Sequence, residues 1–304
     1  MATGRSYKLN AGISIPALGL GTWQSPDAEV YTAVLTALEV GYKHIDSAFC
    51  YGNEQPVGKA IADSPVARED IFLTTKLWST YHSRVAEALD LSLKNLGTDY
   101  VDLYLMHWPV PMNPAGNHPM FPTRADGSRD LVAEADWDFV KTWAEMQKLL
   151  GTGKVKAIGV CNFSIHNLEI LLKAPTTTVV PAVNQCEMHP YLPQFKLFEY
   201  CAAKGIHMTA YSPLGSTSAP LQDEAVVQKV AEANGKSAAQ VLISWGIQRG
   251  ASVIPKSVTP SRIEANFQDF VVADADMAAL DAISKTTTKR VVSPAWGVKI
   301  FHDE

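Results

Sequence analysis

The stretch IFLTTKLWSTYHSRVAEALDLSLKNLGTDYVDLYLMHWP at residues 71–109 contains one complete unit of the pattern that decides the fold. It opens with an apolar run near Ile71–Leu77, continues with an amphipathic helical pattern over Ser83–Leu96, stops at Gly97 and returns to an apolar run near Val101–His107. Glycine often follows the last turn of a helix, because it adopts the left-handed backbone conformation without a steric penalty. Two short apolar runs separated by such a helix indicate parallel strands joined by a crossover.

The same alternation continues on both sides of this unit. Eight strands are expected near Ala17–Leu20, His44–Ser47, Ile71–Leu77, Val101–His107, Val155–Val160, Val179–Gln185, His207–Ser212 and Ser252–Pro255. The helices between them are expected near Asp27–Val40, Glu54–Ala62, Ser83–Leu96, Asp138–Leu150, Ile165–Lys173, Gln194–Ala203, Ser237–Arg249 and Ser261–Gln268. Further elements are expected as extra helices at Glu224–Ala233 and Asp274–Ser284 and as a hairpin over Tyr7–Ile15.

Eight strand–helix units with short connections favour one closed (β/α)8 barrel of the TIM type, an α/β fold, in a single domain over residues 1–304. The rival architecture is an open doubly wound sheet. It would place a Gly-x-Gly-x-x-Gly turn after an early strand to hold a dinucleotide, and the sequence contains no such motif.

The composition limits the classes of function. The chain of 304 residues has a net charge of −5, so no broad basic surface for a nucleic acid is expected. No apolar run approaches the ~18 residues of a membrane span, and the N-terminus lacks the profile of a signal peptide. The four cysteines include no Cys-x-x-Cys pair, which favours a reduced, cytoplasmic protein. No His-x-His or His-Glu-x-x-His segment occurs, so no metal site of these kinds is expected.

Four ionisable residues of different types fall at the ends of expected strands. Asp46 closes the second strand, Tyr51 lies just beyond it, Lys76 closes the third strand and His107 closes the fourth. The active site of a (β/α)8 barrel lies at this end of the strands, so the four residues are expected on one rim. Each residue alone has an ordinary explanation as a helix cap, a core ring, a surface amine or a buried imidazole. Their joint placement on neighbouring strands favours a catalytic site.

The chemistry of the four residues is coherent. Tyrosine has a reference pKa of about 10, so proton transfer near neutral pH requires its phenolate to be stabilised by about 3–4 kcal/mol. A lysine cation ~4 Å away supplies about 4 kcal/mol at an effective dielectric constant of ~20. Lys76 is therefore expected to lower the pKa of Tyr51, Asp46 to hold Lys76 charged and oriented, and His107 to hydrogen-bond the substrate oxygen.

Six blocks extend this pattern over the chain. They are HIDSAFCYGNE at 44–54, TTKLW at 74–78, YLMHWP at 104–109, GVCNF at 159–163, AYSPLG at 210–215 and IPKSVTPSRIEANF at 254–267. In this order they resemble the aldo-keto reductase family, and the tail KRVVSPAWGVKIFHDE at 289–304 is most similar to the fungal branch with glycerol dehydrogenases and glyceraldehyde, aldose and uronate reductases. The resemblance implies a monomer that reduces an aldehyde or sugar-derived carbonyl with NADPH, or oxidises glycerol or polyols with NADP. Tyr51 is then the acid of a tetrad with Asp46, Lys76 and His107.

The resemblance also implies a cofactor site. Tyr211 is expected to stack on the nicotinamide, Asn162 and Gln185 to hydrogen-bond its carboxamide, and the loop from Ser212 to Thr217 to wrap the pyrophosphate. The full expected set is Gly21, Thr22, Trp23, Asp46, Asn162, Gln185, Tyr211, Ser212, Leu214, Ser216, Lys256, Ser257, Arg262 and Asn266.

Three members of that set favour NADPH over NADH. Lys256, Ser257 and Arg262 form a cationic and hydroxyl cluster suited to a 2′-phosphate. Two positions of the expected cofactor site depart from the family pattern: Cys161 stands where serine is usual, and Ala265 stands where glutamate is usual. The first change weakens one carboxamide hydrogen bond, and the second affects adenine binding.

The substrate pocket is expected to have aromatic walls, since such surfaces pack against the C–H faces of sugars. Its expected residues are Trp23, Tyr51, Trp78, His107, Trp108, Phe121 and Trp296, with Cys50 also touching the pocket. The long irregular stretch Pro109–Ala135 and the tail after Lys285 are expected to act as binding loops. A basic residue of the tail, such as Lys289, Arg290 or Lys299, would favour a substrate with a carboxylate.

Two other functions fit the same barrel. A glycosidase could use Glu187, near the end of the sixth strand, but this residue lacks a convincing acidic partner and the tetrad would have no role. A binding or structural protein is the second alternative, because members of this fold serve as channel-associated subunits or lens proteins. The presence of all four tetrad residues favours the enzyme.

Overall fold

Eight parallel strands form the centre of the computed structural model, which describes residues 4–216 and 219–302. They are β3 (Leu20–Gly21), β4 (His44–Asp46), β5 (Phe72–Leu77), β6 (Val101–Met106), β7 (Val155–Cys161), β8 (Val183–Glu187), β9 (His207–Tyr211) and β10 (Ser252–Val253). Each strand pairs with the next in chain order. Parallel bridges from Leu18 to Val253 and from Gly21 to Lys256 join the first and last strands. The sheet therefore closes into the (β/α)8 barrel expected from the sequence.

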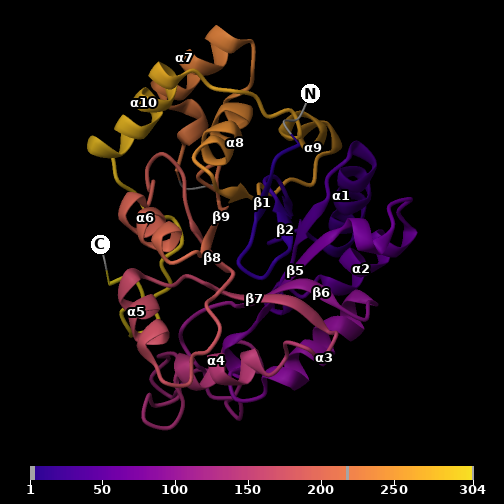
Figure 1. The fold of residues 1–304 in the computed structure, drawn as a ribbon, viewed down its shortest axis with the longest axis vertical. Helices are drawn as coiled ribbons and strands as arrows, with labels where there is room; N and C mark the ends of the chain where they lie inside the picture. Colours follow the sequence, from indigo (N-terminus) through magenta and orange to yellow (C-terminus); the bar gives the residue numbers. More distant parts are fainter. Residues whose placement is uncertain (1–3, 217–218, 303–304) are drawn as a thin grey trace.

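Helices cover the outside of this barrel, as Figure 1 shows. They are α1 (Asp27–Val40), α2 (Glu54–Asp63), α3 (Val85–Leu96), α4 (Phe139–Gln147), α5 (Ile165–Lys173), α6 (Phe195–Ala203), α7 (Ala225–Asn234), α8 (Ala238–Gln248), α9 (Pro260–Asn266) and α10 (Asp274–Ala282). Short 3-10 turns lie at η1 (Phe49–Tyr51), η2 (Arg68–Asp70), η3 (Ser79–Tyr81), η4 (Leu221–Asp223) and η5 (Ile283–Lys285). Local signals set many of the ends: Ser237 and Gln240 form a capping box at α8, and Gly41 and Gly97 end α1 and α3 in the left-handed conformation.

Several expected boundaries differ from the structure. The first strand, expected over Ala17–Leu20, is observed at Leu20–Gly21. The strand expected over Val179–Gln185 begins only at Val183, because the Val179 backbone is hydrogen-bonded to the Gln147 and Trp143 side chains of α4 and not to a neighbouring strand. The helix expected to reach Leu150 ends at Gln147. Beyond that point the backbone continues in tighter i→i+3 turns, such as Leu150 N–H to Gln147 O at 3.2 Å, before Gly151.

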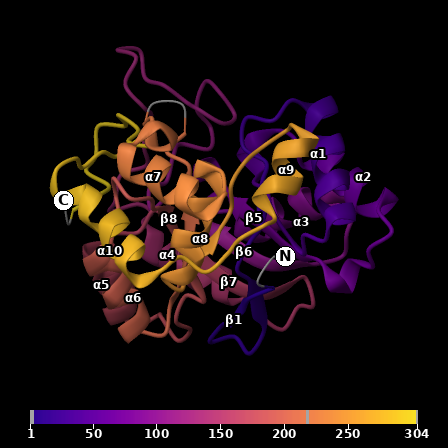
Figure 2. The same ribbon diagram turned by 90° about the horizontal axis from the view of Figure 1, so that it is seen from above.

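The hairpin of β1 (Ser6–Lys8) and β2 (Ser14–Pro16) closes one end of the barrel. Its Ile15 is fully buried and packs into a cluster with Phe72 and Leu103, which lie near the starts of β5 and β6. In Figure 2 this hairpin lies on the lower side, and the magenta segment between β6 and α4 extends from the upper side. The carboxyl ends of the strands, where the expected site lies, are therefore at the end away from the hairpin.

The segments that follow the strands at the open end are ordered by their own contacts. Bridges between Met112 and Leu131 and between Thr123 and Arg129 fold the long β6–α4 segment back on itself. The tail returns to the same rim, where Trp296 and Ile300 are buried against Trp108. Within residues 4–216 and 219–302, no helix is long and apolar enough to cross a membrane.

Candidate active site

The four strand-end residues lie side by side at the open end of the barrel. Asp46 is the last residue of β4, Lys76 lies near the end of β5, Tyr51 ends the 3-10 turn after β4, and His107 follows β6. Lys76 Nζ donates to Asp46 Oδ1 at 2.5 Å and to the Tyr51 hydroxyl at 3.3 Å. The rings of Tyr51 and His107 meet edge to face with centroids 5.7 Å apart. The Tyr51 hydroxyl therefore lies beside the Lys76 ammonium, and the Tyr51 ring lies beside the His107 imidazole.

Lys76 is held in a single orientation. Its side chain is fully buried, and its ammonium also donates to the Ser47 carbonyl at 2.8 Å. An ammonium has three hydrogens, and the three acceptors are Asp46, Ser47 and Tyr51. A buried charge requires this degree of pairing, because desolvation of an isolated ammonium costs several kcal/mol.

The pKa of Tyr51 moves in the opposite direction to the one expected from the sequence. Burial raises the pKa of the phenol well above its usual value of 10, and the Asp46 carboxylate adds to the rise. The expectation counted only the attraction of Lys76, whereas the folded chain also removes water from the phenol. Tyr51 is therefore a protonated phenol at neutral pH, the form that an acid must have before it donates.

His107 is uncharged at neutral pH. Burial lowers the pKa of its imidazole well below 6.5, and the Lys76 cation contributes. Its ring packs edge to face against Trp78 at 5.4 Å, and its Nδ1 lies 3.4 Å from Cys50 Sγ. A neutral imidazole has one N–H to offer to a substrate oxygen.

The residues expected around the nicotinamide are already hydrogen-bonded to one another. Gln185 Nε2 donates to Asp46 Oδ2 at 2.7 Å, and the Tyr211 hydroxyl donates to Asn162 Oδ1 at 2.7 Å. Asn162 Nδ2 donates to the His107 carbonyl at 2.9 Å and lies 3.2 Å from Cys161 Sγ. These hydrogen bonds link residues near the carboxyl ends of different strands: β8 to β4, β9 to β7 and β7 to β6. The carboxamide contacts of Asn162 and Gln185 stay a prediction.

The rim continues from the tetrad towards the expected phosphate cluster. Gly21 pairs with Asp46 on one side and with Lys256 on the other, and both the backbone and the hydroxyl of Thr22 donate to the Asp46 carbonyl. A Cβ on Gly21 would lie 2.8 Å from the Ile254 carbonyl, so only glycine allows this approach of β3 to β10. The barrel closure therefore brings residues from the start and the end of the sequence to one edge.

The side chains along this edge fit a phosphorylated dinucleotide. Lys256 and Arg262 are exposed, and neither makes an ion pair within the described ranges. Ser257 is buried, and its hydroxyl oxygen accepts from Thr259 N–H, which leaves the hydroxyl hydrogen for a ligand. Two cations and a hydroxyl are a suitable donor set for a phosphate. Asn266, at the end of α9, is buried nearby in the same segment.

The loop after β9, which is expected to wrap the pyrophosphate, has three residues in the left-handed backbone conformation. Ser212 and Ser216 have φ values of 48° and 54°, and Gly215 has a φ of 83°. A Cβ on Gly215 would lie 2.5 Å from the Ala219 carbonyl, so the turn admits no side chain there. Half-buried Leu214 lies within this turn. Thr217, expected in the same loop, lies outside the described residues.

An aromatic cluster covers the tetrad. Trp108 and Trp296 meet at 5.0 Å, Trp78 and Trp296 at 6.2 Å, and Trp78 and Phe121 at 5.1 Å. Phe121 is 42% exposed and lies at the outer edge of this group. Trp23, also 42% exposed, lies after β3 and is outside the buried cluster. Apart from Trp23, the expected wall residues are thus brought together.

The sequence-based expectation did not include several residues of this aromatic cluster. Met112, Ile300 and Phe301 belong to the same cluster. They lie in irregular segments, where no periodic pattern distinguishes a wall residue from a solvent-exposed one.

Glu187 has a structural role that excludes the glycosidase alternative. Its side chain is fully buried, and its two oxygens accept from the backbone N–H groups of Val291 and Val292 at 2.6 and 2.7 Å. It also hydrogen-bonds His189 at 2.8 Å. Burial favours the neutral acid, but the hydrogen bonds from His189, Val291 and Val292 outweigh it and lower the pKa of Glu187. An ionised, fully bonded carboxylate cannot act as the acid of a glycosidase.

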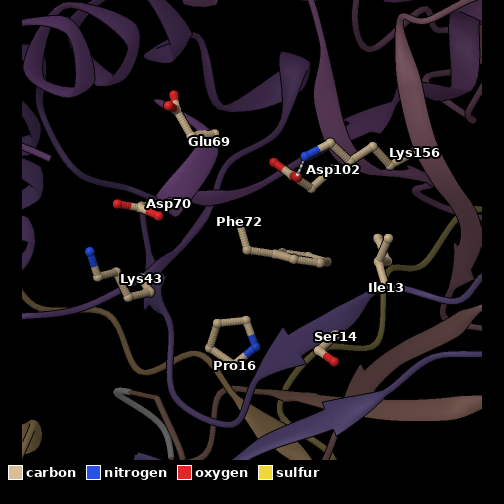
Figure 3. A pocket seen from close by; sticks show the side chains of 9 residues that line it. All are labelled: Ile13, Ser14, Pro16, Lys43, Glu69, Asp70, Phe72, Asp102 and Lys156. Carbon is tan, nitrogen blue, oxygen red and sulfur yellow. Dashed lines mark ion pairs between the residues drawn. The ribbon is translucent and has the colours of Figure 1, made fainter. Parts of the chain in front are cut away.

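A hollow lies at the hairpin end of the barrel and has a volume of about 200 Å³. Figure 3 shows it beside the start of β5, with Phe72 in the middle and Asp102 paired to Lys156 at 2.8 Å. The second oxygen of Asp102 accepts from Arg68 and from Leu73 N–H. These bonds connect neighbouring strands, so we assign the charges around this hollow to stability. Across the described ranges, no three His, Cys, Asp or Glu side chains gather as a metal site.

Comparisons with known proteins agree with this geometry. Residues 17–285 match the model of the aldo/keto reductase family. The chain is 52% identical to a D-galacturonate reductase of Hypocrea jecorina, with 96% of each chain covered. It is 53% identical to a glycerol 2-dehydrogenase (NADP(+)) of Saccharomyces cerevisiae, with 95% of this chain and 94% of that protein covered. The structure of an aldose reductase from Schistosoma japonicum superposes with a TM-score of 0.90 at 39% identity, with 98% of each chain covered.

Proposed function

The chain belongs to the aldo-keto reductase family, and from this premise we propose that it uses NADPH to reduce an aldehyde or sugar-derived carbonyl to the alcohol. It is an oxidoreductase that acts with a nicotinamide cofactor. The observation that carries the proposal is the buried Lys76 ammonium, which contacts both the Asp46 carboxylate and the Tyr51 hydroxyl. We further propose that residues 1–304 form one domain and that the protein is a cytoplasmic monomer.

The proposed reaction divides the work between the tetrad residues. A dihydronicotinamide held by these residues would supply the hydride. Tyr51 donates its phenolic proton to the carbonyl oxygen, and its phenolate is then stabilised by Lys76. At the observed separation of 3.3 Å the attraction is about 5 kcal/mol for an effective dielectric constant of ~20. Asp46 keeps Lys76 charged and oriented, and His107 donates its N–H to the same oxygen.

The cofactor preference rests on the cluster beside α9. Lys256, Ser257 and Arg262 would hold the 2′-phosphate, Tyr211 would stack on the nicotinamide, and the Ser212–Ser216 turn would receive the diphosphate. Lys256 and Arg262 are both cationic and exposed. This favours NADPH, which carries a 2′-phosphate, over NADH, which lacks it.

The substrate is proposed to be a small polyhydroxylated aldehyde, such as glyceraldehyde, an aldose or a uronate, with oxidation of glycerol or a polyol as the reverse reaction. Relatives named D-galacturonate reductase, glycerol 2-dehydrogenase and D/L-glyceraldehyde reductase support this class. The aromatic walls of Trp78, Trp108 and Trp296 suit the C–H faces of such molecules.

A carboxylate-binding role for the tail can be tested separately. The Arg290 guanidinium lies 3.6 Å from the centre of the Phe301 ring, whereas Lys299 is exposed. If either residue selects uronates, Arg290→Ala or Lys299→Ala will lower kcat/KM for D-galacturonate relative to DL-glyceraldehyde. An unchanged ratio in both variants would remove these two residues from substrate selection.

The direct test follows NADPH absorbance with DL-glyceraldehyde, D-xylose, L-arabinose, D-galacturonate and D-glucuronate, and NADP reduction with glycerol. Turnover in this panel that requires Tyr51 supports the proposal. Binding of NADPH without turnover of any of these compounds would favour a binding protein or a bulkier carbonyl substrate.

A further inference from the structure

Cys50 lies against the imidazole of the tetrad in a way that the proposed reaction leaves unused. Its Sγ is 3.4 Å from His107 Nδ1, within hydrogen-bond distance for sulfur. Cys50 is part of the 3-10 turn that ends at Tyr51, so one short turn carries both the acid and this thiol. The side chain packs at the edge of the cluster formed by Trp78 and Trp108.

We infer that Cys50 is a positioning residue that fixes which ring nitrogen of His107 carries the hydrogen, and thereby selects the form of the enzyme that binds a carbonyl oxygen. This inference rests on the proposed function. A neutral imidazole has two tautomers: one offers Nε2–H and accepts at Nδ1, and the other does the reverse. The hydrogen bond made by one nitrogen determines the state of the other.

The contacts of the two groups favour hydrogen on Nε2. Within the described chain, Cys50 Sγ has only His107 Nδ1 as a side-chain hydrogen-bond partner, and the ring of His107 has only Cys50 Sγ as a hydrogen-bond partner. If Nδ1 accepts, the S–H hydrogen is bonded and Nε2–H remains for the substrate. If Nδ1 carries the hydrogen, the thiol hydrogen loses this acceptor and Nε2 presents a lone pair, which repels a carbonyl oxygen.

The protonation states agree with this arrangement. Burial raises the pKa of the Cys50 thiol, so the sulfur keeps its hydrogen. Burial, with a smaller effect of Lys76, lowers the pKa of His107, so the ring stays neutral. A thiol held in this protonated form is a poor nucleophile, which disfavours a redox role for the same cysteine. The neutral aromatic rings of Tyr51, Trp78 and Trp108 pack around the imidazole at centroid distances of 5.7, 5.4 and 6.3 Å.

The tautomer of His107 can be measured directly. Long-range ¹H–¹⁵N correlation spectra of the ¹⁵N-histidine-labelled enzyme distinguish a protonated from an unprotonated ring nitrogen. His107→Gln identifies the signal among the eight histidines. We expect hydrogen on Nε2 in the wild type, a shift towards the other tautomer in Cys50→Ala, and retention of Nε2–H in Cys50→Ser, whose hydroxyl can donate in the same way.

Kinetics provide the second readout. The loss of one hydrogen bond of ordinary strength predicts that Cys50→Ala lowers kcat for aldehyde reduction about fivefold. The KM for NADPH should stay the same, and Cys50→Ser should recover the activity. Cys201→Ala serves as the matched control, because it removes a buried thiol of α6 that does not contact His107.

Two results would overturn the inference. One is a wild-type spectrum with hydrogen on Nδ1. The other is a Cys50→Ala variant with an unchanged His107 tautomer, even if its activity falls, because the loss would then come from packing. If the wild type reduces no carbonyl compound at all, the proposed function fails, while the spectra still decide the role of Cys50.

Discussion

Lys76 is a buried cation whose hydrogen bonds link three other residues of the candidate site. It lies in the wall of the barrel with no solvent exposure, yet each of its three hydrogens has an acceptor. Removing one partner of a buried pair leaves the other charge uncompensated, which typically costs 3–5 kcal/mol. The tetrad therefore contributes to the stability of the fold as well as to the proposed reaction.

Tyr51→Phe is expected to lower kcat for carbonyl reduction by about 100- to 10,000-fold, because the variant keeps the ring and removes the proton donor. The quenching of NADPH fluorescence should be unchanged, since the cofactor cluster beside α9 is untouched. If cofactor binding were lost as well, Tyr51 would have a different role from the one proposed.

Arg262→Ala is expected to raise the KM for NADPH by about tenfold or more, because a charge-assisted hydrogen bond to the 2′-phosphate is lost. NADH lacks this phosphate, so its KM is the internal control and should stay nearly constant. Equal effects on both cofactors in steady-state assays would contradict the assignment.

The elements differ in how their positions are fixed. Helix α1 has the bounds expected from its pattern, because its ends carry local signals: acidic Asp27 and Glu29 in the first turn and left-handed Gly41 after the last. The segment before β8 differs from expectation because Gln147, distant in sequence, binds the Val179 backbone. The tail likewise depends on a distant group, the carboxylate of Glu187.

Glu187→Ala is expected to detach the start of the tail without unfolding the barrel. It leaves the N–H groups of Val291 and Val292 without their acceptor, at about 1–3 kcal/mol for each group that stays buried. The KM for the carbonyl substrate should rise, and limited proteolysis should cleave the tail faster. Glu199→Ala, at an exposed position of α6, is the control. A tail equally resistant in both variants would show that other contacts hold it.

Closure of the barrel buries several histidines and thereby lowers the pKa of their imidazoles. Burial lowers the pKa of His44 to about 4 and that of His207 to about 4, from a usual value of 6.5. Between these values the unfolded chain binds protons that the folded chain does not. The free energy of unfolding therefore falls as the pH falls from 6.5 to about 4, and these two groups have no further effect above 6.5.

Urea denaturation should detect this effect. We expect a lower midpoint at pH 5 than at pH 7, because a tenfold difference in proton affinity between the folded and the unfolded chain corresponds to about 1.4 kcal/mol. His207→Gln should weaken the dependence, because it removes one of the buried histidines whose pKa is lowered. Equal midpoints at pH 5 and pH 7 in the wild type would contradict the prediction.

The sequence by itself determined the barrel and the membership of its tetrad. Strand–helix alternation is a local pattern, and parallel strands all end on the same side, so Asp46, Lys76 and His107 had to share a rim. Only the tertiary structure decided how these groups are bonded and charged. The direction of the Tyr51 pKa depends on how much water the fold excludes, and the bonds from Gln185 to Asp46 and from Val291 to Glu187 join residues more than 100 positions apart. A local sequence pattern cannot predict these contacts, because burial and contacts between distant residues exist only once the barrel has closed.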